Sequence, residues 1–196
     1  MSEDTKEKIV AGAFRALVRD GYSNTTVKDI AGEAGVASGL VHYYFASKEE
    51  LLVAAIDHGC EESYVAARSL ETLDPLSAAR RGFEFEKQQL RSSRELYLLI
   101  FDMYGVGLHN PVIAEAVRRY IRERRDSITS IGKALLEQAP SRPTTPIEAT
   151  SAAIWGSFVG ISLQKLLDPE FDSDAALDAL ADMVFTYLPI AIERVV

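Results

Sequence analysis

Apolar residues recur along this chain with the period of an α-helix. Between Thr5 and Asp20 they form a stripe two residues wide, which is typical of a helix with one buried face. The stripe consists of Ile9, Val10, Ala13, Phe14, Leu17 and Val18. No later segment shows the apolar–polar alternation of a half-buried strand. The pattern predicts an all-α protein.

Two very short helices follow the first one. The earlier begins at Thr26, and its apolar residues fall at i, i+3, i+4 and i+7, on one helical face. Gly35 breaks the period and can take a left-handed backbone conformation at little cost. The later short helix runs from Ser38 to Tyr44, before Ser47 opens another. Two short helices joined by a glycine-containing turn predict a helix-turn-helix unit, which needs flanking helices to bury its apolar face.

Six further helices complete the expected architecture, so that three helices form a head and six form a body. Most of their starts carry a capping residue, often followed by proline. The expected spans are Ser47 to about Ser69, Asp74 to about Arg91, Ser93 or Arg94 to the GVG of 105–107, Asn110 onward for about seven turns, Thr145 to Leu167, and Ser173 or Asp174 to the C-terminus with a bend at Pro189. The predicted fold is therefore a nine-helix protein with a boundary between residues 47 and 48.

Composition is that of an ordinary globular protein, with 47% hydrophobic and 26% charged residues in 196. The formal charge of −8 and the pI near 5.0 argue against binding of polyanions by the whole surface. Residues 1–50 hold six Lys or Arg against eight Asp or Glu. Any DNA binding must therefore depend on a few placed cations, hydroxyls and helix N-termini.

The remaining compositional signals suit the cytoplasm. Cys60 is the single cysteine, so an intrachain disulfide is impossible, and a buried helix residue is a more ordinary role for it than redox sensing. The charged N-terminus lacks the apolar core of a signal peptide. No apolar run is long enough to predict a membrane span.

The stretch TTVKDIAGEAGVASGLVHYYFASKEELL resembles the DNA-binding signature of the TetR family of bacterial transcription regulators. The residues at the family's spacings are Thr26, Ile30, Ala31, Ala34, Gly35, Val36, Gly39, Tyr44, Phe45, Lys48 and Leu51. Leu40 and Val41 stand where a Thr-Leu pair is common, and His42 where Tyr is common. The later segment AAIWGSFVGISLQKLLDPEFD is similar to the BetI-like branch of the family.

The resemblance implies a homodimer with a helix-turn-helix DNA-binding domain at 1–47 and a helical ligand-binding and dimerisation domain at 48–196. The N-terminal part of the 38–44 helix is expected to face base edges in the major groove. By resemblance, Thr26, His42, Tyr43 and Lys48 contact phosphates. The full set of expected DNA-binding residues is Thr26, Lys28, Ala37, Ser38, Gly39, Leu40, His42, Tyr43 and Lys48.

The family also holds a small-molecule effector in its body and dimerises through its last two helices. Aromatic and polar candidates for the pocket are Phe83, Tyr97, Phe101, Tyr104, His109, Tyr120, Trp155 and Phe158. Plain core packing is the alternative for these residues. Small and apolar residues predict the dimer interface at Ala152, Trp155, Gly156, Val159, Gly160 and Leu163. Packing within one subunit is the alternative there.

Other functions fit the sequence less well. The three histidines are scattered, and no phosphate loop, nucleophile elbow or zinc-protease motif is present, so neither an enzyme nor a cofactor is expected. His58 near Glu61 and Glu62 resembles a metal site only weakly. A helical ligand-binding or interaction protein that has lost specific DNA binding is the rival hypothesis. Repressor is preferred over activator by family analogy alone.

Overall fold

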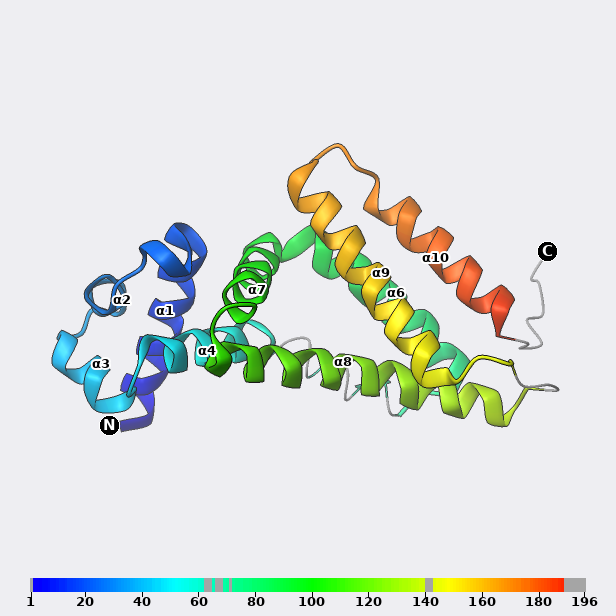
Figure 1. Ribbon diagram of the computed structural model, residues 1–196, viewed down its shortest axis with the longest axis horizontal. Helices are drawn as coiled ribbons and strands as arrows, with labels where there is room; N and C mark the ends of the chain where they lie inside the picture. Colours follow the sequence, from blue (N-terminus) through cyan, green and yellow to red (C-terminus); the bar gives the residue numbers. More distant parts are fainter. Residues whose placement is uncertain (1, 62–64, 66–68, 71, 140–142, 189–196) are drawn as a thin grey trace. The chain divides into compact units, whose positions relative to one another are not determined.

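The computed structural model describes residues 2–61, 65, 69–70, 72–139 and 143–188 (Figure 1). Over these residues nine helices are described, the further residues 61, 65, 69 and 70 are helical as well, and no residue is in a strand, which confirms the all-α prediction. The helices are α1 (Ser2–Asn24), α2 (Val27–Ala34), α3 (Ser38–Tyr44), α4 (Lys48–Gly59), α6 (Pro75–Ser92), α7 (Arg94–Gly107), α8 (Pro111–Glu137), α9 (Ile147–Leu167) and α10 (Ser173–Tyr187).

The chain divides into two compact units. The first unit comprises residues 1–64 and 95–119, and the second comprises residues 65–94 and 120–196. The first unit therefore contains the whole expected head together with later helical residues. The expected boundary between residues 47 and 48 concerns function, and it stays a prediction.

The core of the head is built where α1 packs on α2 and α4, and α2 packs on α3. Each helix contributes residues at the helical spacing read from the sequence, and these are almost fully buried. They include Ile9, Ala13, Ala16, Leu17, Ile30, Ala31, Val41, Phe45, Leu51, Leu52, Ala55 and Ile56. Cys60 is buried as expected, although it caps the C-terminus of α4 and does not lie inside the helix.

α1 and α2 approach each other most closely at Gly12. A Cβ atom on Gly12 would lie 2.8 Å from the Cβ of Ala34 and 2.9 Å from its backbone nitrogen. Real Cβ atoms do not approach backbone so closely, so α2 would have to shift away from α1. Gly12 thus sets the distance between the two helices.

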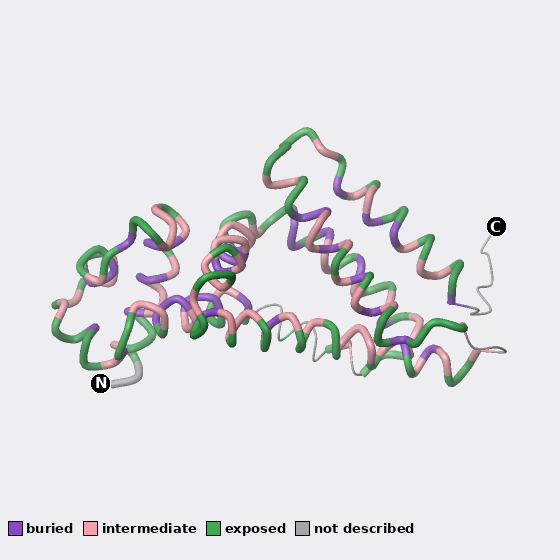
Figure 2. Tube along the Cα trace, in the orientation of Figure 1, coloured by how far each residue is buried: buried purple, intermediate pink, exposed green. Residues whose placement is uncertain are grey.

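The second unit has its own apolar core. Figure 1 shows α9 and α10 side by side and antiparallel, and α10 also packs on α6. Along α9 and α10, buried positions recur between exposed ones (Figure 2). One buried cluster joins α8, α9 and the end of α10 through Leu135, Ile147 and Leu188, with partly buried residues of α6 packed against it.

Helix caps agree with the sequence at some positions and differ at others. The Asp74 carboxylate accepts from the Ser77 amide at 3.0 Å, and the Asn110 side chain accepts from the Val112 amide at 3.0 Å. Both predicted caps are confirmed. The Thr145 cap is wrong, because α9 begins after Pro146 without a side-chain cap. The cap of α10 is Asp172, one residue before the predicted pair.

Two expected helix ends also differ. α1 continues to Asn24 beyond a kink at Gly21, where φ is 74° and ψ is 165°, a left-handed conformation that favours glycine. α4 ends at Gly59, and Cys60 forms a turn, so the helix expected to run to about Ser69 is interrupted there, although the described residues 61, 65, 69 and 70 are helical. Residues 62–64 and 66–68, and the predicted bend at Pro189, lie outside the described residues.

Every helix in the described part of the chain is too short or too polar to span a lipid bilayer.

Gly12→Ala should destabilise the head, because the added methyl group meets the backbone of α2. We expect the free energy of unfolding to fall by about 2 kcal/mol, measured by urea denaturation. Gly32→Ala is the matched control: a Cβ there meets nothing within 4 Å, so the better helix propensity of alanine should stabilise by about 0.5–1 kcal/mol. Equal effects at both sites would contradict the close approach of α1 and α2.

Candidate DNA interface and ligand site

The turn between α2 and α3 has the geometry that the sequence predicted. Gly35 caps α2 with φ 67° and ψ 32°, and the Val36 amide donates to the Ala31 carbonyl at 3.0 Å. This left-handed glycine cap reverses the chain direction while satisfying carbonyls at the end of α2. α3 then starts after Ala37, which makes no side-chain cap.

Two buried side chains fix the orientation of α3 and leave its other side exposed. Val41 and Phe45 are buried in the head. Tyr43 is 78% exposed and Leu40 is 42% exposed. Of the other expected DNA-binding residues, the exposed ones are Thr26, Lys28, Ala37, Gly39 and His42, and the half-buried ones are Ser38 and Lys48. The surface of α2 and α3 thus presents most of the expected set to solvent.

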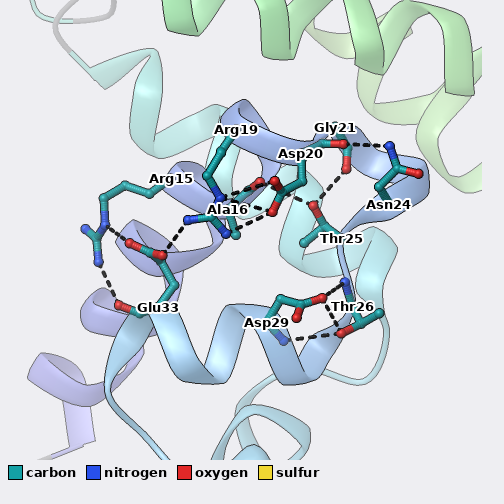
Figure 3. A network of polar contacts seen from close by, with 10 residues as sticks. All are labelled: Arg15, Ala16, Arg19, Asp20, Gly21, Asn24, Thr25, Thr26, Asp29 and Glu33. Atoms are coloured by element: carbon teal, nitrogen blue, oxygen red, sulfur yellow. Dashed lines mark hydrogen bonds and ion pairs between the residues drawn. The ribbon is translucent and has the colours of Figure 1, made fainter.

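Thr26 forms a complete capping box with Asp29 at the start of α2 (Figure 3). The Thr26 hydroxyl accepts from the Asp29 amide at 3.2 Å, and the Asp29 carboxylate accepts from the Thr26 amide at 2.8 Å. The hydroxyl also donates to Asp29 at 2.5 Å. These bonds lower the pKa of Asp29. A phosphate contact by the Thr26 hydroxyl would therefore compete with its bond to Asp29.

Ion pairs between α1 and α2 occupy two of the cations of the head. Figure 3 shows Arg15 and Arg19 directed toward Glu33. The Glu33 carboxylate lies 2.8 Å from the guanidinium of Arg19 and 3.0 Å from that of Arg15. The hydrogen bonds from Arg19 and Arg15 lower the pKa of Glu33. Arg19 also pairs with Asp20 at 2.8 Å. These arginines hold α2 on α1, so their charges are already compensated within the protein.

Lys48 is directed toward the end of α1. Its ammonium donates to the Tyr22 carbonyl and lies 4.0 Å from the centroid of the Tyr22 ring. Burial lowers the pKa of Lys48. Lys48 therefore attaches α4 to α1, a role that sequence reasoning missed. The phosphate contact expected from the family resemblance stays a prediction.

Tyr22 is the centre of a polar network within the first unit. Its amide donates to Asp102 of α7 at 2.5 Å, and its hydroxyl donates to Glu49 of α4 at 2.8 Å. Asn110, which caps α8, also donates to Glu49 at 3.3 Å. Burial, followed by the bond to Glu49, raises the pKa of Tyr22 to about 12. The network joins the end of α1 to α4, α7 and the start of α8.

Few cations of the head are available for a polyanion. Lys8 pairs with Asp4 at 2.8 Å, and both arginines are paired. Lys28 is exposed and makes no ion pair with any described residue. Lys6 is exposed too, and its ammonium lies 5.8 Å from the Phe45 ring centroid, next to the end of α3. The sequence alone gave no reason to select Lys6, because its nearness to α3 is a tertiary contact.

The eight aromatic and polar residues expected to line one pocket fall into both units. Phe83, Phe158, Trp155 and Tyr120 belong to the second unit and form a continuous ring series, with successive centroid distances of 5.4, 6.5 and 6.0 Å. The remaining four belong to the first unit, where the rings of Phe101 and Tyr104 lie 5.7 Å apart. Tyr97 is half-buried and His109 is exposed. Among the described residues, the ring series is the one group in which four of the expected residues form a chain of ring contacts within a single unit.

Trp155 carries the most informative polar atom of the ring series. Its indole Nε1 is buried and has no hydrogen-bond partner among the described residues. A buried donor without an acceptor costs about 1–3 kcal/mol. The ring itself packs on Tyr120 and Phe158 of the same chain. These contacts suit a ligand-lining role, whereas the predicted dimer contact of Trp155 stays a prediction.

The other residues predicted for a dimer interface lie on the outer surface of α9. A Cβ on Gly156 or Gly160 would meet no atom within 4 Å. Leu163 is 41% exposed, and the neighbouring Leu167 is 77% exposed. Ala152 and Val159 are half-buried. Gly156, Gly160, Leu163 and Leu167 thus form the open part of this face within the described chain.

No group of three His, Cys, Asp or Glu side chains in the described ranges could hold a metal ion. Glu62, one member of the weak metal-like group, lies outside those ranges.

The fold and the α2–α3 surface define a helix-turn-helix protein with a helical body. Residues 9–55 match the family model of bacterial regulatory proteins, tetR family. The N-terminal quarter of the chain thus carries the signature of the tetR family of bacterial regulatory proteins, as the sequence resemblance indicated. Its relatives are HTH-type transcriptional regulators and not enzymes.

Relatives and solved structures extend the similarity to the whole chain. The probable HTH-type transcriptional regulator ArpR of Pseudomonas putida is 36% identical over 83 residues, which cover 41% of this chain and 40% of that protein. The chain thus matches about two fifths of the length of this relative. The HTH-type transcriptional regulator BetI of Paraburkholderia phytofirmans is 23% identical over 193 residues, covering 94% and 93%.

A transcriptional regulator structure from Saccharomonospora viridis, determined in complex with choline, has the same fold. Its TM-score is 0.78 at 20% identity, and the alignment covers 94% of this chain and 97% of that one.

Tyr22→Phe should weaken the first unit in a pH-dependent manner. The bond from Tyr22 lowers the pKa of Glu49, so its contribution is present above the unfolded pKa and is lost as pH falls through the folded pKa. The raised pKa of Tyr22 adds stability below about pH 10 that is lost toward pH 12. We expect a loss of about 1–2 kcal/mol near neutral pH, which shrinks at acid pH.

Urea denaturation across the pH range measures this difference. Tyr187→Phe is the control, since Tyr187 is 43% exposed and makes no described hydrogen bond. A loss for Tyr22→Phe that stays constant into the acid range would show that the bond to Glu49 contributes no stability.

Proposed function

We propose that this chain is a homodimeric transcriptional regulator that binds a near-palindromic DNA operator and responds to a small molecule. In this proposal residues 1–47 bind DNA, and residues 48–196 bind the ligand and dimerise. The observation that carries it is the helix-turn-helix match over residues 9–55, together with the exposed α2–α3 surface. DNA binding would place its action in the cytoplasm, and repression is the proposed mode.

The proposed docking puts the N-terminal part of α3 in the major groove. Ser38 can contact a base or a phosphate, Leu40 can touch a thymine methyl group, and Gly39 allows close approach of the backbone. The remaining expected contacts would come from Thr26, Lys28, Ala37, His42, Tyr43 and Lys48. Because α3 offers few hydrogen-bonding groups to bases, phosphate contacts should provide much of the affinity.

The proposed dimer uses the open face of α9 and the neighbouring face of α10. Gly156 and Gly160 would let a second copy approach closely, as in a four-helix interface. Leu163 and Leu167 would be buried there, and so would Met183 of α10, which is 62% exposed. Burial of this apolar area would supply the association free energy.

The proposed ligand site is the ring series of the second unit. Phe83, Tyr120 and Phe158 are already buried, and the Trp155 indole N–H offers a hydrogen-bond donor to an acceptor on the ligand. The choline complex of the Saccharomonospora viridis regulator is consistent with a small-molecule site on this fold. The ligand would reduce operator binding only by the difference in its affinity for the DNA-competent and DNA-incompetent states.

One observation favours the rival function, a helical ligand-binding protein without specific DNA binding. The head is net acidic. Both of its arginines form ion pairs with Glu33, and Arg19 also pairs with Asp20. The retained helix-turn-helix geometry and the exposed Lys28 and Tyr43 argue for DNA binding instead.

Selection from a pool of randomised DNA duplexes, at two salt concentrations, separates the two functions. Enrichment of a palindrome whose affinity falls steeply with salt would support the proposed regulator. A folded, ligand-free protein that enriches no sequence at low salt would favour the rival function.

Lys28→Gln and Lys6→Gln should each weaken operator binding, since these cations are free to contact phosphates. We expect a loss of about fivefold to tenfold at low salt, alike for all bound sequences. Each substitution removes two contacts per dimer, so the slope of log K against log salt should fall by about two. Fluorescence anisotropy with a labelled operator measures both quantities.

Arg15→Gln is the charge-matched control, because Arg15 is already paired with Glu33. Lys48 is a poor choice, since its loss also removes the contact with Tyr22. If Arg15→Gln changes the salt slope as much as Lys28→Gln, the assignment of free and paired cations is incorrect.

Leu163→Glu should convert the proposed dimer to a monomer and abolish tight operator binding. The glutamate would be buried without a partner in the dimer but solvated in the monomer. Sedimentation equilibrium measures the change, and we expect dimerisation to weaken at least about tenfold. Leu108→Glu is the control, because Leu108 is 82% exposed and lies outside this face. A Leu163→Glu protein that stays dimeric would place the interface elsewhere.

A further inference from the structure

The second unit contains a cavity of about 750 Å³ between α6 and α10, within the size range of small-molecule sites. Residues of two helices line it: Arg80, Phe83 and Glu84 from α6, and Asp178, Ala181, Asp182, Phe185 and Thr186 from α10. Of these residues, only Phe83 belongs to the ring series. Neither DNA binding nor dimerisation, as proposed above, uses this cavity.

Two phenylalanines give the cavity an aromatic wall. The rings of Phe83 and Phe185 lie 5.8 Å apart at an interplanar angle of 56°. The Phe83 ring also contacts the Phe158 ring, with the two centroids 5.4 Å apart. The wall therefore presents aromatic surface, which attracts cations through the negative faces of the rings.

Carboxylates outnumber cations around this wall. The lining contains Glu84, Asp178 and Asp182, against Arg80. Lys87 of α6 adds one more positive charge, since its ammonium binds Glu84 at 2.8 Å and also binds Asp178. These bonds raise the pKa of Lys87. One negative charge remains uncompensated.

Asp182 is the carboxylate left available. It lines the cavity, is exposed, and makes no hydrogen bond or ion pair with any described residue. Arg80 on the opposite helix is also without an ion pair in the described part of the chain, and the two side chains do not pair across the cavity. Lys87, about two turns along α6 from Arg80, shows that carboxylates from both helices accommodate an ammonium group.

We propose that this cavity binds a small organic monocation, with its charged nitrogen near Asp182 and its apolar or aromatic part against Phe83 and Phe185. A single positive charge would neutralise the lining, whereas an anion would add to its one uncompensated negative charge. A divalent metal is disfavoured because Lys87 already occupies Glu84 and Asp178, and the described residues hold no metal-binding group.

The cavity and the proposed dimer interface use different sides of α10. Asp178, Asp182 and Phe185 are spaced i, i+4 and i+7 and share one face. Met183 is exposed on another face. Binding of the cation is thus compatible with dimerisation, and it does not depend on the proposed DNA function. A role of the cation as effector would rest on that function.

Isothermal titration calorimetry of the full chain tests the proposal, with benzyltrimethylammonium as the probe. Benzyl alcohol serves as the neutral comparison and phenylacetate as the anionic one. We expect saturable binding of the cation and an affinity at least about tenfold lower for the other two, because only the cation neutralises the lining. The affinity should also fall with added salt.

Asp182→Asn should weaken cation binding about fivefold, because it removes the available negative charge while keeping the shape. Glu170→Gln removes the same charge from an exposed position outside the cavity and should change the affinity less than twofold. Phe185→Leu should weaken binding about threefold through loss of the aromatic face. Thermal denaturation of each variant verifies that it is folded.

Three results would overturn the proposal: no saturable binding of the cation by the folded wild-type protein, equal or tighter binding of phenylacetate, or unchanged affinity in Asp182→Asn. Repeating the operator titration with and without benzyltrimethylammonium is a separate experiment. If the cation binds but leaves DNA affinity unchanged, the cavity site stands and its role as effector site fails. If no operator can be found, the calorimetry still decides whether the cavity binds a cation.

Discussion

Helices α2 and α3 are too short to be stable in isolation, and burial of their apolar faces is the constraint on which the head depends. With eight and seven residues, they cannot offset the cost of helix nucleation by themselves. Ile30 and Ala31 are buried in α2, which packs on α1 and α3, and Val41 is buried in α3, which packs on α2. The side of α3 that carries Leu40 and Tyr43 is exposed because the opposite side is needed for packing.

The same constraint determines how the charges of the head are used. Arg15 and Arg19 hold α2 against α1 through Glu33, and Gly12 sets the distance at which this happens. Stability of the head and attraction for DNA therefore draw on the same small set of cations. Lys6 and Lys28 remain available to a polyanion. Lys48 could serve either the stability of the head or the attraction for DNA, because its ammonium already binds the Tyr22 carbonyl.

Much of the fold could be predicted from the sequence, because the signals are local. The helical period, the left-handed Gly35 and the caps at Thr26, Asp74 and Asn110 involve residues within one or two turns. The exact start of α10 was missed by one residue because Asp172, Ser173 and Asp174 can all cap a helix. The Thr145 cap failed because Pro146 itself precedes the helix.

The candidate sites could be predicted less well from the sequence, because they depend on contacts between distant parts of the chain. Tyr22 and Asp102 are 80 residues apart in sequence, and no local pattern connects them. Periodicity also could not separate the eight expected pocket residues into two units, since aromatic residues at helical spacing look alike in a core and in a ligand site. The acidic cavity was missed because Glu84 and Asp178 look like ordinary solvated charges on their own helices.

Trp155 has a consequence for spectroscopy, since it is the only tryptophan among the 196 residues. Indole emission depends on the polarity around the ring and on hydrogen bonding at its nitrogen. Here both are determined by the ring series. The Trp155 Nε1 is buried without an acceptor in the described part of the chain, and the indole packs against the rings of Tyr120 and Phe158. Tryptophan emission of the unlabelled protein, excited where tyrosine does not absorb, therefore reports on the ring series alone, and an acceptor reaching that nitrogen would change the emission spectrum directly.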